Sequence, residues 1–226
     1  MKRILKLFGV LSLLATISVA CNKELDLTSN GDEESNTSVK TKSTDYYWYD
    51  GKKIFLTQVE NRSFIIYRIS DKSSLRASLN KRGVDLDSSK AHEYRLGALK
   101  PYGNASDSFS NCEWAEVEIN YKTALVIPEV IYATPFYSSN GRSFPLTNLV
   151  YVSFNGYSEL FLLEKLAKEY NVEIIGQIIT QTDAFILFVV ACTKDSKGNA
   201  LEVSNWLYES GVFRFTDPGF MSATGC

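Results

Sequence analysis

Apolar side chains recur with regular spacing in the second half of the chain. Alternation predicts strands there at residues 149–154, 172–179, 184–192 and 212–216. Apolar positions three and four apart predict helices at residues 158–170 and 199–210, the second ended by Gly211. The resulting order is βαββαβ over residues 146–220. This order is typical of the split βαβ, ferredoxin-like arrangement, in which both helices cover one face of four antiparallel strands. The chain is therefore predicted to have an α+β fold.

The first half of the folded region, residues 46–137, has a weaker and more β-rich pattern. Strands are predicted at residues 46–49, 52–56, 63–69, 113–121 and 130–137, and a helix at 71–82 that ends at Gly83. The pair Asp50-Gly51 is suited to the tight turn of a hairpin. Residues 84–111 are rich in turn formers and contain one candidate strand near 94–99. The segments at 64–69, 71–82 and 130–137 echo those at 149–154, 158–170 and 212–220, which predicts a degenerate copy of the same unit.

The predicted strand at residues 184–192 is apolar on both of its faces. Helices can cover only one face of such a sheet. At about 25 cal/mol per Å² of buried apolar surface, an open apolar face of several hundred Å² would be unfavourable in water. Either residues 46–137 cover this face, or a partner protein does.

The first 45 residues predict an export signal followed by a tether. Lys2, Arg3 and Lys6 precede an apolar run at 7–20, which is long enough for a signal peptide and too short for a membrane-spanning helix. The sequence Ser-Val-Ala-Cys that ends at Cys21 resembles the lipobox of bacterial lipoproteins, whose cysteine carries lipid. Ordinary cleavage near residue 20 is the alternative. A lipid anchor would place the chain in the cell envelope, at a membrane face that the sequence does not specify. Residues 21–45 are acidic and polar, as in a flexible tether.

Charge balance argues against a nucleic-acid partner. The chain has 24 basic and 26 acidic side chains, and loss of residues 1–20 would leave 21 and 26, a net charge of −5. Nucleic-acid affinity comes from clustered cations, and none follow the signal peptide.

The inventory of reactive residues favours a noncatalytic protein without cofactor or metal. The single histidine, His92, has no nearby metal-ligand pattern, and no nucleophile elbow or phosphate-binding glycine loop is present in the sequence. Cys112, Cys192 and Cys226 allow at most one disulfide within the mature chain.

Four segments resemble the N-terminal propeptide-like region of lipid-anchored subtilisin-like serine peptidases of Bacteroidales. They are LTNLVYVSF at 146–154, LLEKLAKEYNVEIIG at 162–176, CTKDSKGNAL at 192–201 and YESGVF at 208–213, with a further likeness in YYWYDGKKIFL at 46–56. The resemblance departs from the family at its end, because the catalytic domain should begin after Phe220 and the sequence given stops at Cys226.

The resemblance implies a protein that assists the folding of a peptidase and inhibits it. In the family the sheet docks on the enzyme and the following tail lies along the substrate cleft. Phe220 and Met221, with the tail at 221–226, match that tail by position, and Asp217 lies near where propeptides place acids that cap helices of the enzyme. Two alternatives stay open: an interaction or scaffold lipoprotein of the envelope, with the aromatic cluster at 46–49 as a conceivable ligand platform, or the remnant of a truncated peptidase.

Overall fold

The computed structural model describes residues 45–87, 91–96, 99–102, 109–139, 141–154, 157–178 and 186–221. All of them belong to one compact unit that spans residues 42–226. The predicted signal peptide, Cys21, the tether up to residue 44 and tail residues 222–226 lie outside the described residues.

The described part of the chain has an α+β fold, as predicted, in which the sheet strands pair antiparallel. Its strands are β1 (Tyr46–Tyr49), β2 (Lys52–Phe55), β3 (Thr57–Arg68), β4 (Ala91–Glu93), β5 (Lys100–Pro101), β6 (Cys112–Val117), β7 (Val130–Ser139), β8 (Arg142–Phe154), β9 (Glu173–Ile178), β10 (Ile186–Ala191) and β11 (Phe215–Phe220). Its helices are α2 (Lys72–Asn80), α3 (Tyr121–Leu125), α4 (Leu160–Tyr170) and α5 (Ala200–Glu209), with short 3-10 turns η1 (Ile69–Asp71) and η4 (Tyr157–Glu159).

The strands of the second half lie in the order β11–β8–β10–β9, and every neighbouring pair is antiparallel. This is the order expected for the predicted βαββαβ unit. The register places Val152 of β8 opposite Phe188 of β10, so the two strands predicted at 149–154 and 184–192 are neighbours in one sheet. Leu163 of α4 and Val203 of α5 belong to the same buried cluster as Val152 and Phe188, which places both helices on this face.

The first half repeats this order. Its strands lie as β7–β3–β6–β4, again all antiparallel, with α2 following β3 and α3 following β6. Leu75, Leu79 and Ala124 from these two helices pack with Ile65 and Ala115 of the sheet. The two halves therefore have the same sequence of elements and the same strand order, as the expectation of a degenerate copy requires.

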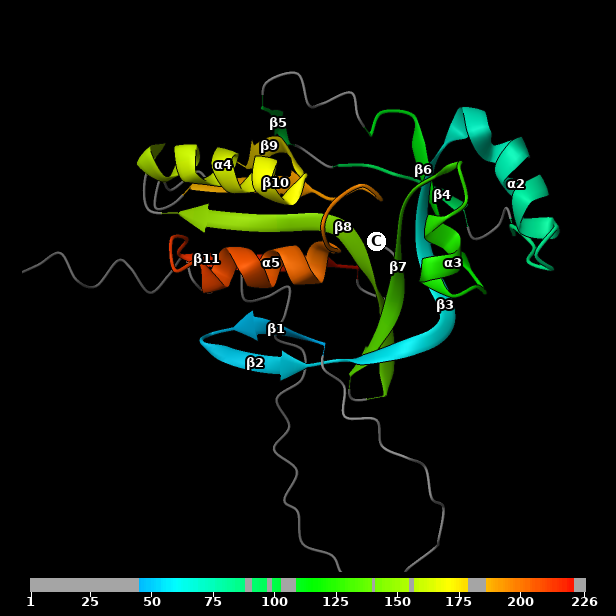
Figure 1. Ribbon diagram of the computed structural model, residues 1–226, viewed down its shortest axis with the longest axis horizontal. Coiled ribbons are helices and arrows are strands. Elements are labelled where there is room, and N and C mark those ends of the chain that lie inside the picture. Colours follow the sequence, from blue (N-terminus) through cyan, green and yellow to red (C-terminus); the bar gives the residue numbers. More distant parts are fainter. Residues whose placement is uncertain are drawn as a thin grey trace, which may run out of the picture. The chain divides into compact units, whose positions relative to one another are not determined.

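Strand β8 joins the two halves into one sheet. Its first residues pair with β7, from Arg142 opposite Ser139 to Pro145 opposite Phe136, and its later residues pair with β10 and β11. Figure 1 shows β8 crossing the unit between the strands of the first half and those of the second. The boundary expected between residues 137 and 146 falls at the start of this shared strand.

The helix-free face of the second half is apolar, and the first half covers much of it. Leu149, Val189 and Ala191 are buried there together with Phe109 from the β4–β6 connection. Tyr94, Leu96 and Leu99 of the same connection, together with Ile131 of β7, also pack on this cluster. Strand β5, within the connection, pairs with the outer strand β9. Of the two interpretations of this face, cover by residues 46–137 therefore holds for the described contacts.

Several predicted boundaries are wrong. Residues 94–96 are not in a strand; strands β4 and β5 lie on either side of them. The predicted strand 113–121 ends at residue 117, because Asn120 accepts a hydrogen bond from the backbone N–H of Lys122 and so caps helix α3. The last strand runs over Phe215–Phe220 instead of residues 212–216.

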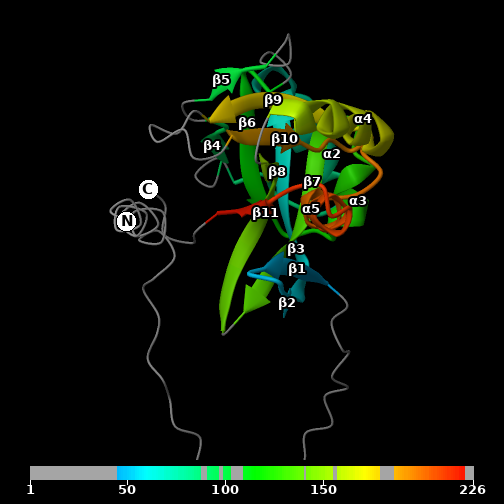
Figure 2. The ribbon, with the colours of Figure 1, turned by 90° about the vertical axis from the view of Figure 1, so that its left-hand side faces the viewer.

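A two-stranded hairpin, β1 and β2, lies beside α5 (Figure 2). Asp50 and Gly51 form its turn with φ values of 48° and 71°, as the sequence predicts for a tight hairpin turn. Trp48 stacks on Tyr208 of α5 at 5.1 Å, and Tyr47 contacts Phe220 of β11 at 5.4 Å. The predicted aromatic cluster thus attaches the start of the folded unit to its last helix and strand.

Candidate functional site

The described part of the chain shows no cluster of acidic, histidine or cysteine side chains that could hold a metal ion. His92 instead packs on the ring of Trp114, with 4.6 Å between ring centroids. Cys112 and Cys192 are both buried and free, and burial raises the pKa of each thiol. Within the described ranges, every helix is too short or too polar to span a bilayer.

A cavity of about 320 Å³ lies where the first half stops covering the sheet of the second half. We call it the β11 groove. Strands β4, β6, β8 and β11, with the residues that directly follow β4 and β11, contribute its lining. The lining residues are Glu93, Tyr94, Arg95, Trp114, Thr147, Leu149, Tyr151, Gly219, Phe220 and Met221. Phe220 and Met221, which the sequence analysis singles out, are therefore brought together with aromatic residues of both halves.

Tyr94, which forms one wall of the groove, is held in place by hydrogen bonds. The hydroxyl of Tyr94 donates to the side-chain oxygen of Asn148, and the Asn148 amide donates to the carbonyl of Cys192 at 3.1 Å. Desolvation raises the pKa of Tyr94 well above its ordinary value, so this hydroxyl keeps its proton at neutral pH. Tyr94 therefore acts as a fixed wall of the groove.

The β11 side of the groove depends on close backbone packing at Gly219. The Thr147 hydroxyl donates to the Gly219 carbonyl at 2.7 Å. A Cβ at Gly219 would lie 2.5 Å from that hydroxyl oxygen, so this position has no room for a side chain without movement of Thr147. Phe220 then packs edge-on against Phe144 at 5.1 Å, and the backbone N–H of Met221 donates to the Pro145 carbonyl at 3.1 Å.

The rim of the groove is charged. Arg95 and Glu93 form an ion pair with 2.6 Å between Nη2 and Oε2, and both side chains are exposed. Exposed ion pairs contribute little to stability, because solvent screens their charges. A ligand can therefore replace this pair at low energetic cost.

Asp217 lies beside the groove on β11, directly opposite Tyr151 of β8. Although the residue is exposed, surrounding protein desolvates its carboxyl group and raises the pKa to about 6. Burial also raises the pKa values of Tyr151 and Tyr47, and the negative charge of Asp217 raises both further. Among the described residues no cation pairs with Asp217.

No family model matches this chain, and no curated protein matches it. The geometry of the described residues is therefore the basis for proposals about function.

Sequence reasoning finds part of this site. It identifies Asp217, Phe220 and Met221 by position, and the structure places the last two in the lining and the first beside it. Phe220 also has an internal packing role against Tyr47 and Phe144. The lining residues from β4, β6 and β8 are missed, because they meet only when the first half folds over the second. Cys21 and Cys226 lie outside the described residues.

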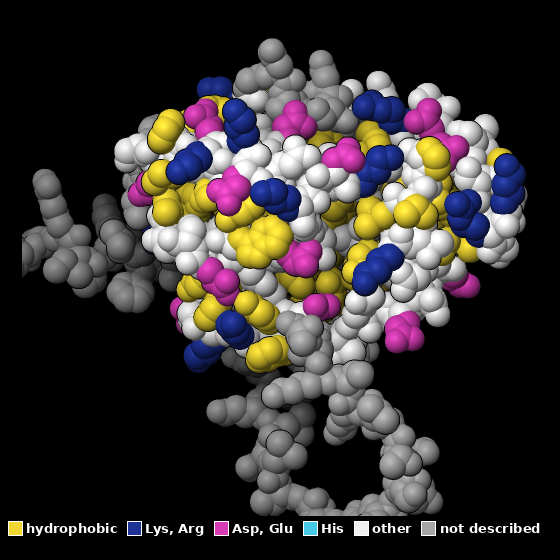
Figure 3. Space-filling model, in the orientation of Figure 1, with side chains coloured by type: hydrophobic (Ala, Val, Ile, Leu, Met, Phe, Trp, Pro, Cys, Tyr) yellow, Lys and Arg dark blue, Asp and Glu magenta, His cyan; other side chains and the backbone are white. Residues whose placement is uncertain are grey.

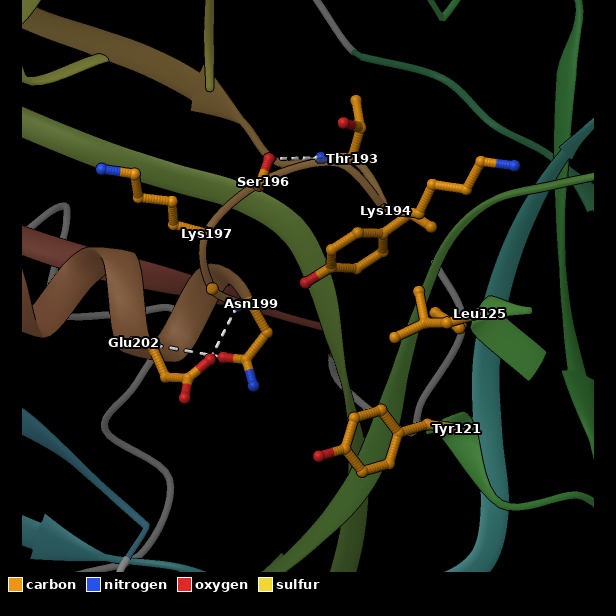
Figure 4. A pocket seen from close by; sticks show the side chains of 11 residues that line it. Tyr121, Leu125, Thr193, Lys194, Ser196, Lys197, Asn199 and Glu202 are labelled. Atoms are coloured by element: carbon orange, nitrogen blue, oxygen red, sulfur yellow. Dashed lines mark hydrogen bonds between the residues drawn. The ribbon is translucent and has the colours of Figure 1, made fainter. Parts of the chain in front are cut away.

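A second cavity, of about 190 Å³, lies between α3 and the loop before α5. Figure 4 shows Tyr121 and Leu125 on one side and the loop from Thr193 to Asn199 on the other. The polar groups at the start of α5 are used internally: the Asn199 side chain accepts from the backbone N–H groups of Leu201 and Glu202, and the backbone N–H of Asn199 donates to Glu202. The polar groups of this cavity therefore cap helix α5, and we base no binding site on them.

Proposed function

We propose that this chain is a noncatalytic lipoprotein of the cell envelope whose folded unit binds a segment of a partner protein in the β11 groove. The observation that carries the proposal is the meeting of Trp114, Tyr151 and Phe220 around a cavity of about 320 Å³ at the uncovered margin of the sheet. Binding sites characteristically combine aromatic and apolar lining with a few placed polar groups.

The size and chemistry of the groove suit polypeptide side chains. An apolar side chain of the partner would contact Trp114, Tyr151 and Met221. The Glu93–Arg95 pair at the rim offers both charges to its backbone or neighbours. Tyr and Trp supply large contact areas at low cost in conformational entropy, which is why they dominate protein interfaces.

The N-terminal features fit a module held at a membrane. Lipid on Cys21 would anchor the chain, and a polar tether of some 25 residues leads from it to β1. The folded unit would then be presented at a distance from the membrane surface.

A second candidate function is inhibition or folding assistance of a subtilisin-like peptidase. It is favoured by the β11–β8–β10–β9 order of the second half and by the exit of the chain from β11 at Met221, beside the groove. Burial of Leu149, Val189 and Ala191 by the β4–β6 connection limits this candidate, because a peptidase could use only the margin of the face near β11.

Binding and inhibition assays against purified subtilisin-like peptidases of the host distinguish the two candidates. The variant Met221→Gln removes an apolar side chain from the groove, and Val126→Gln, at a residue 70% exposed elsewhere on the unit, is the matched control. Inhibition at micromolar concentration that Met221→Gln weakens supports the peptidase candidate. Failure to bind any of these peptidases removes it, and a different partner sensitive to Met221→Gln alone supports the general proposal. A partner that binds both variants as well as the parent contradicts the groove as the binding site.

A further inference from the structure

We propose that the β11 groove selects a partner segment in which a lysine or arginine lies next to an apolar side chain, with Asp217 as the residue that binds the cation. This inference rests on the proposed function and names the chemistry of the ligand that the groove takes.

Asp217 lies on β11 next to residues that line the groove. Its backbone lies opposite Tyr151, and Tyr151 lines the groove, as do Gly219 and Phe220 two and three residues further along β11. A ligand with an apolar side chain in the groove would therefore have its neighbouring residue close to the Asp217 carboxylate.

Within the described residues, the Asp217 carboxylate has no cationic partner. The ion pairs of the described residues are Arg62–Glu116, Lys72–Glu113 and Arg95–Glu93, and none involves Asp217. Among the described residues, the titratable groups whose pKa the charge of Asp217 raises are the phenols of Tyr47 on β1 and Tyr151 on β8, and both are uncharged when protonated. A desolvated carboxylate without a cation gains a charge-assisted hydrogen bond when a partner supplies one.

Asp217 is both accessible to a ligand and partly desolvated by the protein. The residue is exposed, so an incoming side chain can reach it, while the protein around it reduces competition from water. Charge pairs in such partly desolvated sites are stronger than pairs fully exposed to solvent. A ligand cation would therefore contribute specificity as well as affinity.

The test titrates three short blocked peptides, Leu-Arg-Leu, Leu-Gln-Leu and Leu-Glu-Leu, into the full mature chain. NMR chemical shifts of the protein amides report the binding of each peptide. We expect the arginine peptide to shift the amide signals of Tyr151 and Gly219 and to bind roughly five- to tenfold more tightly than the glutamine peptide at pH 7.5. Asp217→Asn should abolish this preference, and Asp195→Asn, which removes an exposed charge on the loop before α5, should preserve it.

The possible failures separate the two proposals. Equal affinities for the arginine and glutamine peptides, with shifts still at the groove, overturn the role of Asp217 and leave groove binding in place. Retention of the arginine preference in Asp217→Asn also overturns it. Absence of groove shifts with every peptide overturns both this inference and binding in the groove.

Discussion

Gly219 is the residue on which the shape of the β11 groove depends most closely. Its carbonyl accepts from Thr147, and a Cβ there would lie 2.5 Å from the Thr147 hydroxyl oxygen and 3.2 Å from the Leu149 carbonyl oxygen. Gly219→Ala should therefore lower the free energy of unfolding by about 1–3 kcal/mol, the usual cost of overpacking. Urea unfolding measures this loss. In a Thr147→Ala background the added cost should be smaller, and an equal cost in both backgrounds would contradict the proposed clash.

The raised pKa of the Asp217 carboxyl group makes the stability of the folded unit depend on pH. Its pKa is raised from the usual 3.8 to about 6, so the folded state binds the proton more tightly than the unfolded state does. The stabilisation from this group is present below pH 4 and is lost as the pH rises through 6. Asp217→Asn should therefore be more stable than the parent at pH 7.5, an advantage that disappears at pH 4.

Paired urea midpoints at pH 4 and pH 7.5 check this expectation, with Asp195→Asn as the control for the loss of one exposed charge. Because Asp217 is itself exposed, solvent screening limits the size of the effect, and the sign is the result that matters. A variant that is destabilised equally at both pH values would show that desolvation of this carboxyl group is not a determinant of stability.

At the scale of elements, the β1–β2 hairpin has no strand neighbours in the described residues and depends on side-chain contacts with the rest of the unit. Trp48 provides two of these contacts, a stack on Tyr208 at 5.1 Å and a hydrogen bond from Nε1 to Glu209 at 3.0 Å. The Tyr46 hydroxyl donates to the same carboxylate at 2.8 Å, and these two hydrogen bonds lower the pKa of Glu209. Isolated two-stranded hairpins are marginally stable in water, so these contacts hold the hairpin in place.

Trp48→Ala should release the hairpin from α5. We expect amide hydrogen exchange over residues 46–55 to accelerate more than exchange in β3, with a loss of roughly 1–2 kcal/mol in global stability. Tyr49→Ala, which removes a side chain that is 61% exposed, is the matched control and should leave both measurements close to the parent. Unchanged exchange in Trp48→Ala would mean that other contacts hold the hairpin.

The elements also show how far the sequence predicts the fold. Strong apolar periodicity gives α4, α5 and β10 to within two residues and the second half of β8, whose start lies seven residues before the predicted one. The tight turn at Asp50-Gly51 follows from its two residue types. The β4–β6 connection could not be predicted, because Tyr94, Leu96, Leu99 and Phe109 show no local period and their burial depends on a surface distant in sequence. Only the β11 side of the groove could be predicted, because its other lining residues come from strands that are distant in sequence.

In the described unit as a whole, the two halves have the same strand order, and each half covers apolar surface of the other. The helix-free face of the first half contributes Phe64 and Ile66 to the same cluster as α5, and the connection from that half covers the sheet of the second. Figure 3 shows basic and acidic side chains interspersed with hydrophobic ones over the face viewed in Figure 1. This face therefore carries no single-sign patch of charge that would steer a ligand toward it.

Membrane attachment is a prediction about the full chain. Two or more acyl chains, each methylene worth about 0.8 kcal/mol, would hold the mature protein on a bilayer. Cys21→Ser should therefore move the chain from the membrane pellet to the soluble fraction after cell lysis. Detergent phase partitioning provides the control, and a Cys21→Ser chain that remains in the membrane fraction would contradict lipid attachment at this residue.

Site-specific photo-cross-linking in the intact envelope tests the central claim most directly. A benzophenone amino acid placed at Met221 lies in the groove, and the same amino acid at Val126 lies on exposed surface outside it. We expect a discrete adduct from position 221 and no such adduct from position 126. The partner peptide in that adduct, identified by mass spectrometry, should carry a basic residue beside an apolar one. No adduct at position 221, or the same adducts from both positions, would contradict a partner-binding groove beside β11.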